Sequence, residues 1–423
     1  MGENIPALIS DMGLSAVGAK RVLAAASDET RSRALREMAA CVRAQKASIA
    51  AANARDMEGA KERGLSKAAQ DRLALNDDRM EAMARGLEAI ADRPDPLGKI
   101  LEDRTVAHNG LRIKRVSVPI GVIGVIYEAR PNVTADAAGL CVKSGNACIL
   151  RGGSESFYSC QAVHAALEKG LENAGLPKEC AQFVPTPDRE AVGALLRMAD
   201  CVDLIVPRGG KSLCERVANE SKVPTLLHLD GVCSTYIDAS ANIDMAIKVA
   251  VNAKMRRTGI CGATENILFD KALPKESVCR VISALIEKGC AVRADDAVTQ
   301  ACRGLVVAAA NDHDWGEEYL DAVISAAVVD GVKGAASFIA RYGSAHTDAI
   351  IAENPDAAEY FFAHVDSAIV MHNASTQFAD GGEFGLGAEI GIATGRLHAR
   401  GPVGADQLTT YKYIVIGDGA CRP

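Results

Sequence analysis

Residues 121–126, Gly-Val-Ile-Gly-Val-Ile, form an apolar run without alternation, which is typical of a strand buried on both faces in a parallel sheet. A helical pattern follows at 135–143, and a second short apolar run at 147–150 predicts the next strand. The alternation continues with a helix expected at 157–174 and strands at 181–184 and 202–206. This order predicts a doubly wound α/β sheet, and such sheets bind ligands at the carboxyl ends of their strands.

A second α/β segment begins near Pro224 and repeats the pattern. Its strands are expected at 234–238, 265–269, 304–308, 322–329, 347–351 and 367–371, and its helices at 243–253, 277–288, 332–341 and 355–364. From Asn373 to Gly404 the chain is rich in Gly and polar residues. So long an irregular stretch inside a compact enzyme is normally a functional loop.

Two other parts of the chain complete the expected architecture. Residues 14–92 are Ala-rich with charges at helical intervals, so several helices are expected before the breaker Pro94-Asp95-Pro96. Residues 105–116 predict two short strands around an Asn109-Gly110 turn, and residues 409–416 predict one last strand. Exposed strands of this kind need a partner, because an unpaired sheet edge invites association.

Composition excludes several classes of function. The chain has 423 residues, enough for two or three domains, with 48% hydrophobic and 24% charged residues. A formal net charge of −7 argues against a nucleic-acid or anionic-membrane surface. Its 13 cysteines are scattered without CxxC pairs, which indicates reduced thiols and a cytoplasmic location. Neither a signal peptide nor an apolar run long enough to span a bilayer is evident.

Several catalytic motifs are missing. No G-x-G-x-x-G follows a strand, so a standard dinucleotide fold is unsupported, and Gly-x-Ser-x-Gly is absent. The eight histidines show no metal-binding spacing, so no metal site is expected.

The stretch 252–265, NAKMRRTGICGATE, carries the best candidate nucleophile. Gly259 and Gly262 bracket Cys261 and leave its sulfur open to a ligand, and two arginines precede it. Cations near a thiol favour the thiolate, which is the nucleophile. The alternative is that Cys261, like most cysteines, is a small buried hydrophobe.

Four stretches together resemble one family. They are 127–133 (YEARPNV), 143–154 (KSGNACILRGGS), the Cys261 stretch, and 373–392 (NASTQFADGGEFGLGAEIGI) continuing to LHARGP at 397–402. In this order they are similar to the gamma-glutamyl phosphate reductases (glutamate-5-semialdehyde dehydrogenases), the proline-biosynthesis branch of the aldehyde dehydrogenase superfamily. The resemblance runs from about Leu65 to Tyr413.

The resemblance implies an α/β, aldehyde dehydrogenase-like fold. A doubly wound cofactor-binding domain would comprise residues 1–104 and 121–224, and an α/β catalytic domain residues 225–400. A small β oligomerisation element would comprise residues 105–120 and 401–423. A homodimer or homotetramer is expected, and glutamate 5-kinase is a possible partner.

It also implies an activity, the NADPH-dependent reduction of L-glutamyl 5-phosphate to L-glutamate 5-semialdehyde and phosphate, the second step of proline biosynthesis. Cys261 would form a thioester, and Asn132 with the Cys261 N–H would stabilise the oxyanion. The alternative for Asn132 is a turn residue after Pro131. Aldehyde-oxidising relatives carry a Glu base that activates water to hydrolyse the thioester. The corresponding residues here, 227–233, read Leu-His-Leu-Asp-Gly-Val-Cys and contain no Glu, which agrees with reduction of the thioester. Asp230 remains a possible base.

Cofactor contacts follow by position. The NADP site would use Arg151, Gly152, Ser154, Arg208, Gly209 and Glu318. Arg151 would lie near the 2′-phosphate, residues 207–210 would open a helix near the pyrophosphate, and Glu318 would hold the nicotinamide ribose. The alternatives are a solvated strand-end arginine for Arg151 and an ordinary exposed carboxylate for Glu318.

The substrate contacts suggested by the resemblance are Arg257, Ser375, Thr376, Asp380 and Glu383. A guanidinium suits a phosphate or carboxylate, whereas a solvated polar loop is the alternative for the other four. His346, alone before a strand, is expected to be structural. Two other functions remain open, namely an aldehyde-oxidising or CoA-acylating dehydrogenase and a non-enzymatic binding protein on the same scaffold.

Overall fold

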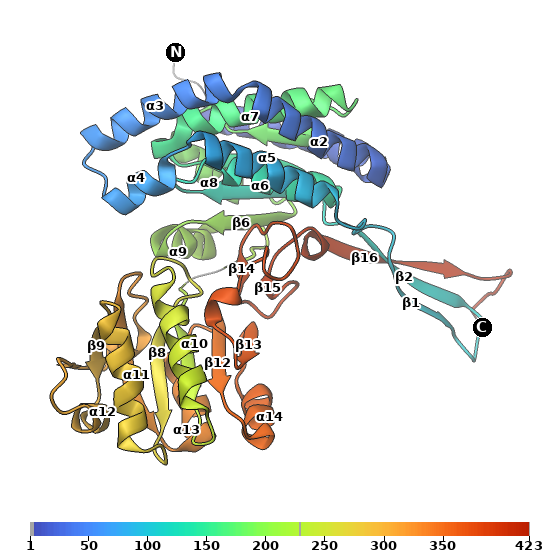
Figure 1. The fold of residues 1–423 in the computed structure, drawn as a ribbon. Coiled ribbons are helices and arrows are strands. Elements are labelled where there is room, and N and C mark those ends of the chain that lie inside the picture. The colour runs from blue at the N-terminus through green and yellow to red at the C-terminus, as the bar shows by residue number, and fades with distance from the viewer. Residues whose placement is uncertain (1–3, 228–229, 423) are drawn as a thin grey trace. The chain divides into compact units, whose positions relative to one another are not determined.

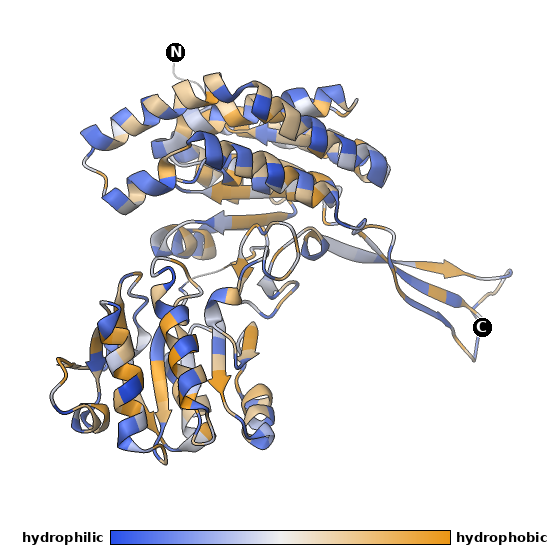
Figure 2. Cartoon of the chain, in the orientation of Figure 1, coloured by the Kyte–Doolittle hydropathy of each residue, from blue (hydrophilic) through white to orange (hydrophobic). Residues whose placement is uncertain are grey.

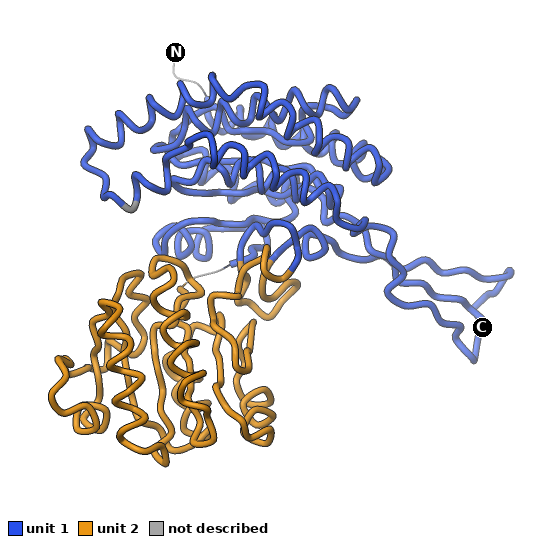
Figure 3. Tube along the Cα trace, in the orientation of Figure 1, with its two compact units in different colours: residues 1–228, 385–391, 403–423 blue, residues 229–384, 392–402 orange. Residues whose placement is uncertain are grey.

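The computed structural model describes residues 4–227 and 230–422. Its internal contacts divide the chain into two compact units (Figure 3). Unit 1 comprises residues 1–228, 385–391 and 403–423, and unit 2 comprises residues 229–384 and 392–402. Each unit contains a parallel sheet with helices, as the expected α/β class requires.

Unit 1 is built on a four-stranded parallel sheet in the order β5-β4-β3-β6. Its edge strand β6 is labelled in Figure 1. The strands are β3 (Val122–Tyr127), β4 (Ala147–Gly152), β5 (Ala181–Phe183) and β6 (Leu204–Arg208). Every residue of β3 is buried, which confirms the prediction from its unbroken apolar run. Gly124 is required in this strand because a Cβ there would lie 2.5 Å from the side chain of Ile205 on β6.

Helices cover this sheet and continue into the N-terminal part of unit 1. They are α1 (Ile5–Ala25), α2 (Asp28–Ala44), α3 (Lys46–Glu62), α4 (Lys67–Leu73), α5 (Asp77–Ala91), α6 (Val133–Lys143), α7 (Phe157–Asn173), α8 (Glu190–Leu196) and α9 (Lys211–Glu220). Lys143, at the end of α6, is fully buried and donates to Asp28 at 2.7 Å and to Ser32 at 2.9 Å. These bonds tie α6 to α2.

Three antiparallel strands form a separate sheet in the order β1-β2-β16. They are β1 (Ile100–Thr105), β2 (Arg112–Pro119) and β16 (Thr409–Ile416), so the hairpin and the last strand predicted from the sequence are confirmed. Gly110 turns the hairpin with a φ of +71°, a conformation that favours glycine. The apolar end of β16, orange in Figure 2, is exposed in this chain.

Unit 2 contains a seven-stranded parallel sheet in the order β10-β9-β11-β8-β7-β12-β13. The strands are β7 (Cys233–Ile237), β8 (Thr264–Asp270), β9 (Ala291–Ala294), β10 (Ala308–Ala309), β11 (Val323–Val329), β12 (Thr347–Ile351) and β13 (Ile369–His372). The helices are α10 (Ile243–Met255), α11 (Lys275–Glu287), α12 (Asp296–Ala301), α13 (Gly331–Tyr342) and α14 (Pro355–His364). The strand predicted at 304–308 is wrong, because Gly304 turns the chain with a φ of +99° and only Ala308 and Ala309 pair.

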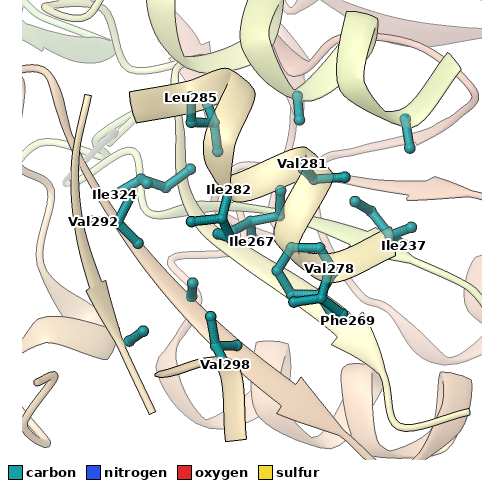
Figure 4. Close-up of a cluster of buried hydrophobic side chains, with 14 of the residues drawn as sticks. Ile237, Ile267, Phe269, Val278, Val281, Ile282, Leu285, Val292, Val298 and Ile324 are labelled. Carbon is teal, nitrogen blue, oxygen red and sulfur yellow. The ribbon is translucent and has the colours of Figure 1, made fainter. Parts of the chain in front are cut away.

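The core of unit 2 follows from the alternation of β8. Ile267 and Phe269 face a cluster that includes Val281 and Ile282 of α11 (Figure 4). Leu268 points to the opposite face, where it joins a second cluster. Apolar side chains therefore cover both faces of the sheet, as is typical of parallel sheets.

The Gly-rich stretch 373–404 is irregular, as expected, apart from the short pair β14 (Ile392–Ala393) and β15 (Gly401–Pro402). Residues 385–391, which the sequence places in the catalytic domain, cluster with unit 1 instead. The close approach of Gly387 explains this, since a Cβ there would lie 3.2 Å from the carbonyl oxygen of Ala89. Among the described helices, none has the length and apolar character that crossing a membrane would require.

Candidate active site

Cys261 lies in a half-buried loop at the amino end of the sheet in unit 2. The loop connects α10 to β8, so it follows the carboxyl end of a helix. Cys233 begins the neighbouring strand β7, and His346 directly precedes β12. The general expectation of ligands at the carboxyl ends of strands therefore does not describe this loop, although it does describe the candidate residues of unit 1.

The segment before β7 packs closely against the main chain of Cys261. A Cβ on Gly231 would lie 2.3 Å from the carbonyl oxygen of Cys261 and 2.6 Å from its Cα. The thiol of Cys233 is 3.1 Å from the same carbonyl oxygen, to which it donates. His228 and Leu229, in the stretch where related enzymes carry a base, lie outside the described residues.

The Gly-rich block contacts the other side of the loop. A Cβ on Gly262 would lie 3.1 Å from the carbonyl oxygen of Thr376, whose hydroxyl lies 3.0 Å from the Thr264 hydroxyl. The side chain of Gln377 donates to the carbonyl oxygens of Ala253 (2.9 Å) and Arg257 (3.2 Å). The loop is thus held between β7 and the Gly-rich block, while Cys261 itself packs at the edge of a small apolar cluster.

A fully buried ion pair lies at the base of the loop. Lys254, in the last turn of α10, is 2.5 Å from Glu265 on β8. Burial raises the pKa of Glu265 to about 7, and the charge of Lys254 opposes this rise. Burial also raises the pKa of half-buried Glu318, the expected ribose ligand, while an N–H of Gly231 opposes it. Glu318 therefore lies near the charges of Asp230, Lys254 and Glu317, which belong to the same unit as Cys261.

Asn132, the expected oxyanion donor, stands at the start of α6 in unit 1. Its side chain is exposed and makes no capping bond to the helix. The amide Nδ2 donates to Asp136 at 3.0 Å, which orients it. Burial raises the pKa of Asp136 to about 6, and the Asn132 bond opposes that shift. One N–H of the amide remains for another acceptor, and the pairing of Asn132 with Cys261 stays a prediction.

Arg151 ends β4 with its guanidinium turned inward. It is 7% exposed, and Nη2 donates to the carbonyl oxygens of Pro187 (2.8 Å) and Asp188 (3.3 Å). Burial lowers its pKa. The alternative of a solvated strand-end arginine does not describe this buried side chain, whose Nη2 bonds brace the loop after β5. The expected role of Arg151 at a 2′-phosphate stays a prediction.

The other candidate cofactor residues of unit 1 lie beyond the carboxyl ends of the strands. Ser154 is exposed in a cleft that is also lined by Arg55, Arg63 and Tyr158. Gly210, beside Arg208 and Gly209, donates its N–H to the Glu128 carboxylate at 2.9 Å, just before α9. This helix start therefore binds an anion, as expected for a pyrophosphate site, and here the anion is a side chain.

The five candidate substrate residues separate by exposure. Arg257, Asp380 and Glu383 are exposed, whereas Ser375 and Thr376 are buried. Asp380 accepts from the N–H groups of the loop that follows it. The buried hydroxyl of Thr376 lies 3.0 Å from the Thr264 hydroxyl beside the Cys261 loop, and the substrate contacts of all five residues stay predictions.

Several supporting residues were missed at the sequence level. The available signal for Glu265 was a charged residue at the start of the strand predicted at 265–269, and the signal for its partner was a lysine at the end of the preceding helix. No local signal identifies Gln377, because its role depends on contacts with residues about 120 positions away.

Comparisons with known proteins identify the family of the chain. Residues 9–331 match the model of the aldehyde dehydrogenase family. A gamma-glutamyl phosphate reductase of Paramagnetospirillum magneticum is 56% identical over 420 residues, covering 99% of each chain. One from Rhodospirillum rubrum is 56% identical over 421 residues, covering 100% of this chain and 98% of that protein.

Solved structures give the same result. The crystal structure of gamma-glutamyl phosphate reductase from Thermotoga maritima matches with a TM-score of 0.95 and 38% identity, covering 98% of this chain and all of that one. The chain therefore belongs to the aldehyde dehydrogenase family of oxidoreductases, within its gamma-glutamyl phosphate reductase branch.

Proposed function

We propose that this enzyme reduces L-glutamyl 5-phosphate to L-glutamate 5-semialdehyde and phosphate with NADPH, as the second step of proline biosynthesis in the cytoplasm. The observation that carries the proposal is full-length identity above 50% to proteins named gamma-glutamyl phosphate reductase. The half-buried Cys261 loop supplies a nucleophile of the kind that this reaction needs.

The proposed chemistry passes through Cys261. Its thiolate attacks the acyl carbon, the acyl–phosphate bond breaks, and phosphate leaves with the bonding electrons to give a thioester. Bound NADPH supplies the hydride that reduces the thioester. Hydride addition leaves a thiohemiacetal oxyanion, which re-forms the carbonyl as the carbon–sulfur bond breaks, so that the bonding electrons return to sulfur and release the aldehyde and the Cys261 thiolate. We assign the developing oxyanion to the Asn132 amide and the Cys261 N–H, donors that are worth a few kcal/mol each in such sites.

The charged residues around the loop suit the substrate. Arg257 is exposed four residues before Cys261, and its main chain is fixed by Gln377. A guanidinium placed there can bind the phosphate or the α-carboxylate. Asp380 and Glu383 are exposed carboxylates in the Gly-rich block and can bind the α-ammonium group. Ser375 and Thr376 then hold the block in place.

Members of the aldehyde dehydrogenase family use a nicotinamide cofactor, and the residues of this chain fit one. An anion already occupies the start of α9 beside Arg208 and Gly209, which is where a pyrophosphate would displace the Glu128 carboxylate. Ser154, next to Gly152, would meet the adenosine ribose, and Glu318 the nicotinamide ribose. Arg151 would act on NADP by bracing the neighbouring loop.

We also propose a homodimer or homotetramer formed through the β1-β2-β16 sheet. Tyr413, Val415 and Ile416 of β16 are exposed apolar or aromatic side chains at its edge. An exposed edge strand of this length favours pairing with another chain. A lasting complex with glutamate 5-kinase is a separate proposal, which co-purification of the two proteins tests.

The reverse reaction tests the function. Wild-type enzyme should reduce NADP⁺ over many turnovers in the presence of glutamate semialdehyde only when phosphate is added, and Cys261→Ala should abolish this turnover. Cys302→Ala, which removes a buried thiol elsewhere in unit 2, is the matched control. Full activity in Cys261→Ala would exclude the thioester route, and a requirement for coenzyme A in place of phosphate would favour an acylating dehydrogenase.

A further inference from the structure

Cys233 is a second cysteine in contact with the Cys261 loop. It is the first residue of β7 and is completely buried. Its Sγ lies 3.1 Å from the carbonyl oxygen of Cys261 and 3.6 Å from Nδ1 of His346. The same imidazole nitrogen is 2.9 Å from the Thr347 hydroxyl. The thiol therefore lies between the main chain of the nucleophile and a buried histidine.

The environment keeps this sulfur protonated. Burial raises the pKa of the Cys233 thiol well above its ordinary value, and the nearby carboxylates of Asp348 and Glu265 raise it further. A neutral thiol can donate a hydrogen bond, whereas a thiolate cannot. Cys233 is consequently suited to hold an acceptor and unsuited to act as a second nucleophile.

We infer that Cys233 is a positioning residue for the reaction, which fixes the peptide of Cys261 by donating its S–H to the Cys261 carbonyl oxygen. This inference rests on the proposed role of Cys261 as the nucleophile. The stretch that carries a catalytic base in aldehyde-oxidising relatives would then serve here to hold the nucleophile.

Two contacts explain why one weak donor matters at this point. Gly231 fits against the Cys261 main chain because it has no Cβ, and the N–H of Ala263 closes a turn onto the Ile260 carbonyl at 3.0 Å. The Cys233 thiol adds a side-chain bond to the carbonyl between these contacts. Fixing that carbonyl fixes ψ of Cys261 and so restricts where its Cβ and Sγ point. A misplaced nucleophile lowers the rate of attack while leaving substrate binding largely unchanged.

The test compares Cys233→Ala, which removes the donor, with Cys233→Ser, which restores an O–H donor. Steady-state kinetics of the phosphate-dependent reverse reaction give kcat and KM. The alkylation rate of Cys261 by iodoacetamide, followed on its peptide by mass spectrometry across pH 6–10, measures the nucleophile directly. Cys302→Ala is the matched control, because that thiol is equally buried in the same unit but belongs to another cluster.

We expect Cys233→Ala to lower kcat by about 5- to 10-fold, the effect of losing one hydrogen bond, with KM changed less than about 2-fold. Its Cys261 alkylation profile should differ from wild type, and Cys233→Ser should recover most of both properties. If Cys233→Ala does not fold, the test uses Cys233→Ser alone. A Cys233→Ser enzyme that folds but has lost the activity of the wild type contradicts the inference.

The inference is also overturned if Cys233→Ala and Cys302→Ala have the same kcat and the same Cys261 alkylation profile. Failure of the proposed function gives a different result. In that case wild type shows no phosphate-dependent NADP⁺ reduction, or the activity does not depend on Cys261.

Discussion

The buried pair of Lys254 and Glu265 makes a sharp prediction about stability. Both side chains are fully buried, and their charged atoms are 2.5 Å apart. Replacing Lys254 with Met keeps a long apolar stem but leaves Glu265 without its cation. Breaking a buried pair from one side typically costs about 3–5 kcal/mol, whereas replacing both partners with apolar residues is often nearly neutral. We therefore expect that loss for Lys254→Met near pH 8, and a smaller loss for Lys254→Met combined with Glu265→Leu.

The pH dependence gives a second check on the same variant. Burial raises the pKa of Glu265 to about 7 in the wild type, and removing the cation should raise it further. A carboxyl whose folded pKa is raised contributes stability at low pH, and this contribution is lost as the pH rises through the folded pKa. Because the variant keeps the proton to higher pH, its stability relative to wild type should fall by about 1.4 kcal/mol per pH unit above pH 7.

Fluorescence offers a local assay for this loss. The single tryptophan, Trp315, lies in unit 2 and contacts Phe338, so urea unfolding followed by its emission reports on that unit. Arg280→Met is the control, because it breaks an exposed pair with Asp244 and should cost no more than about 1 kcal/mol. A loss below 1 kcal/mol in Lys254→Met, or a double variant as unstable as the single one, would refute the reasoning.

Three further outcomes follow from the structure. Arg151→Met should lower the free energy of unfolding by about 1–3 kcal/mol, because two main-chain carbonyls lose their donor. The same variant should change kcat/KM for NADPH and NADH by similar factors. A selective loss of kcat/KM with NADPH would instead identify a phosphate contact. Burial raises the pKa of Asp348 to about 6, so wild-type stability should decline from pH 4 to 6 by up to about 3 kcal/mol from this group, a slope that Asp348→Asn should lack in urea titrations. Val415→Lys combined with Ile414→Lys should give monomers in size-exclusion chromatography with light scattering; a wild type that is already monomeric contradicts the proposed assembly.

Much of the fold was predictable because it depends on local patterns. The apolar composition of residues 121–126 predicts a buried strand, and the Asn109-Gly110 pair has the backbone preference of a tight turn. The strand expected at 304–308 is wrong, because its apolar composition did not determine its structure. Its apolar residues follow a glycine that turns the chain, and of residues 304–308 only Ala308 pairs with a neighbouring strand.

The candidate site was predictable only in part. The Cys261 loop is visible from its flanking glycines, and the family resemblance identifies the blocks around it. Contacts between distant segments are invisible in the sequence, so the hydroxyl contact between Thr376 and Thr264 could not be predicted. Nothing local to Arg151 indicates its bonds to the carbonyls of residues 187 and 188 either.

The central claim is that the glutamyl group is carried by Cys261 before phosphate takes part in the reverse direction. Rapid mixing of the enzyme with glutamate semialdehyde and NADP⁺, without phosphate, should give a burst of NADPH absorbance equal to one turnover per site. Acid quenching during the burst should give the peptide containing Cys261 with a glutamyl adduct. A burst of the same size in Cys261→Ala, or continuous turnover without phosphate, would contradict the account.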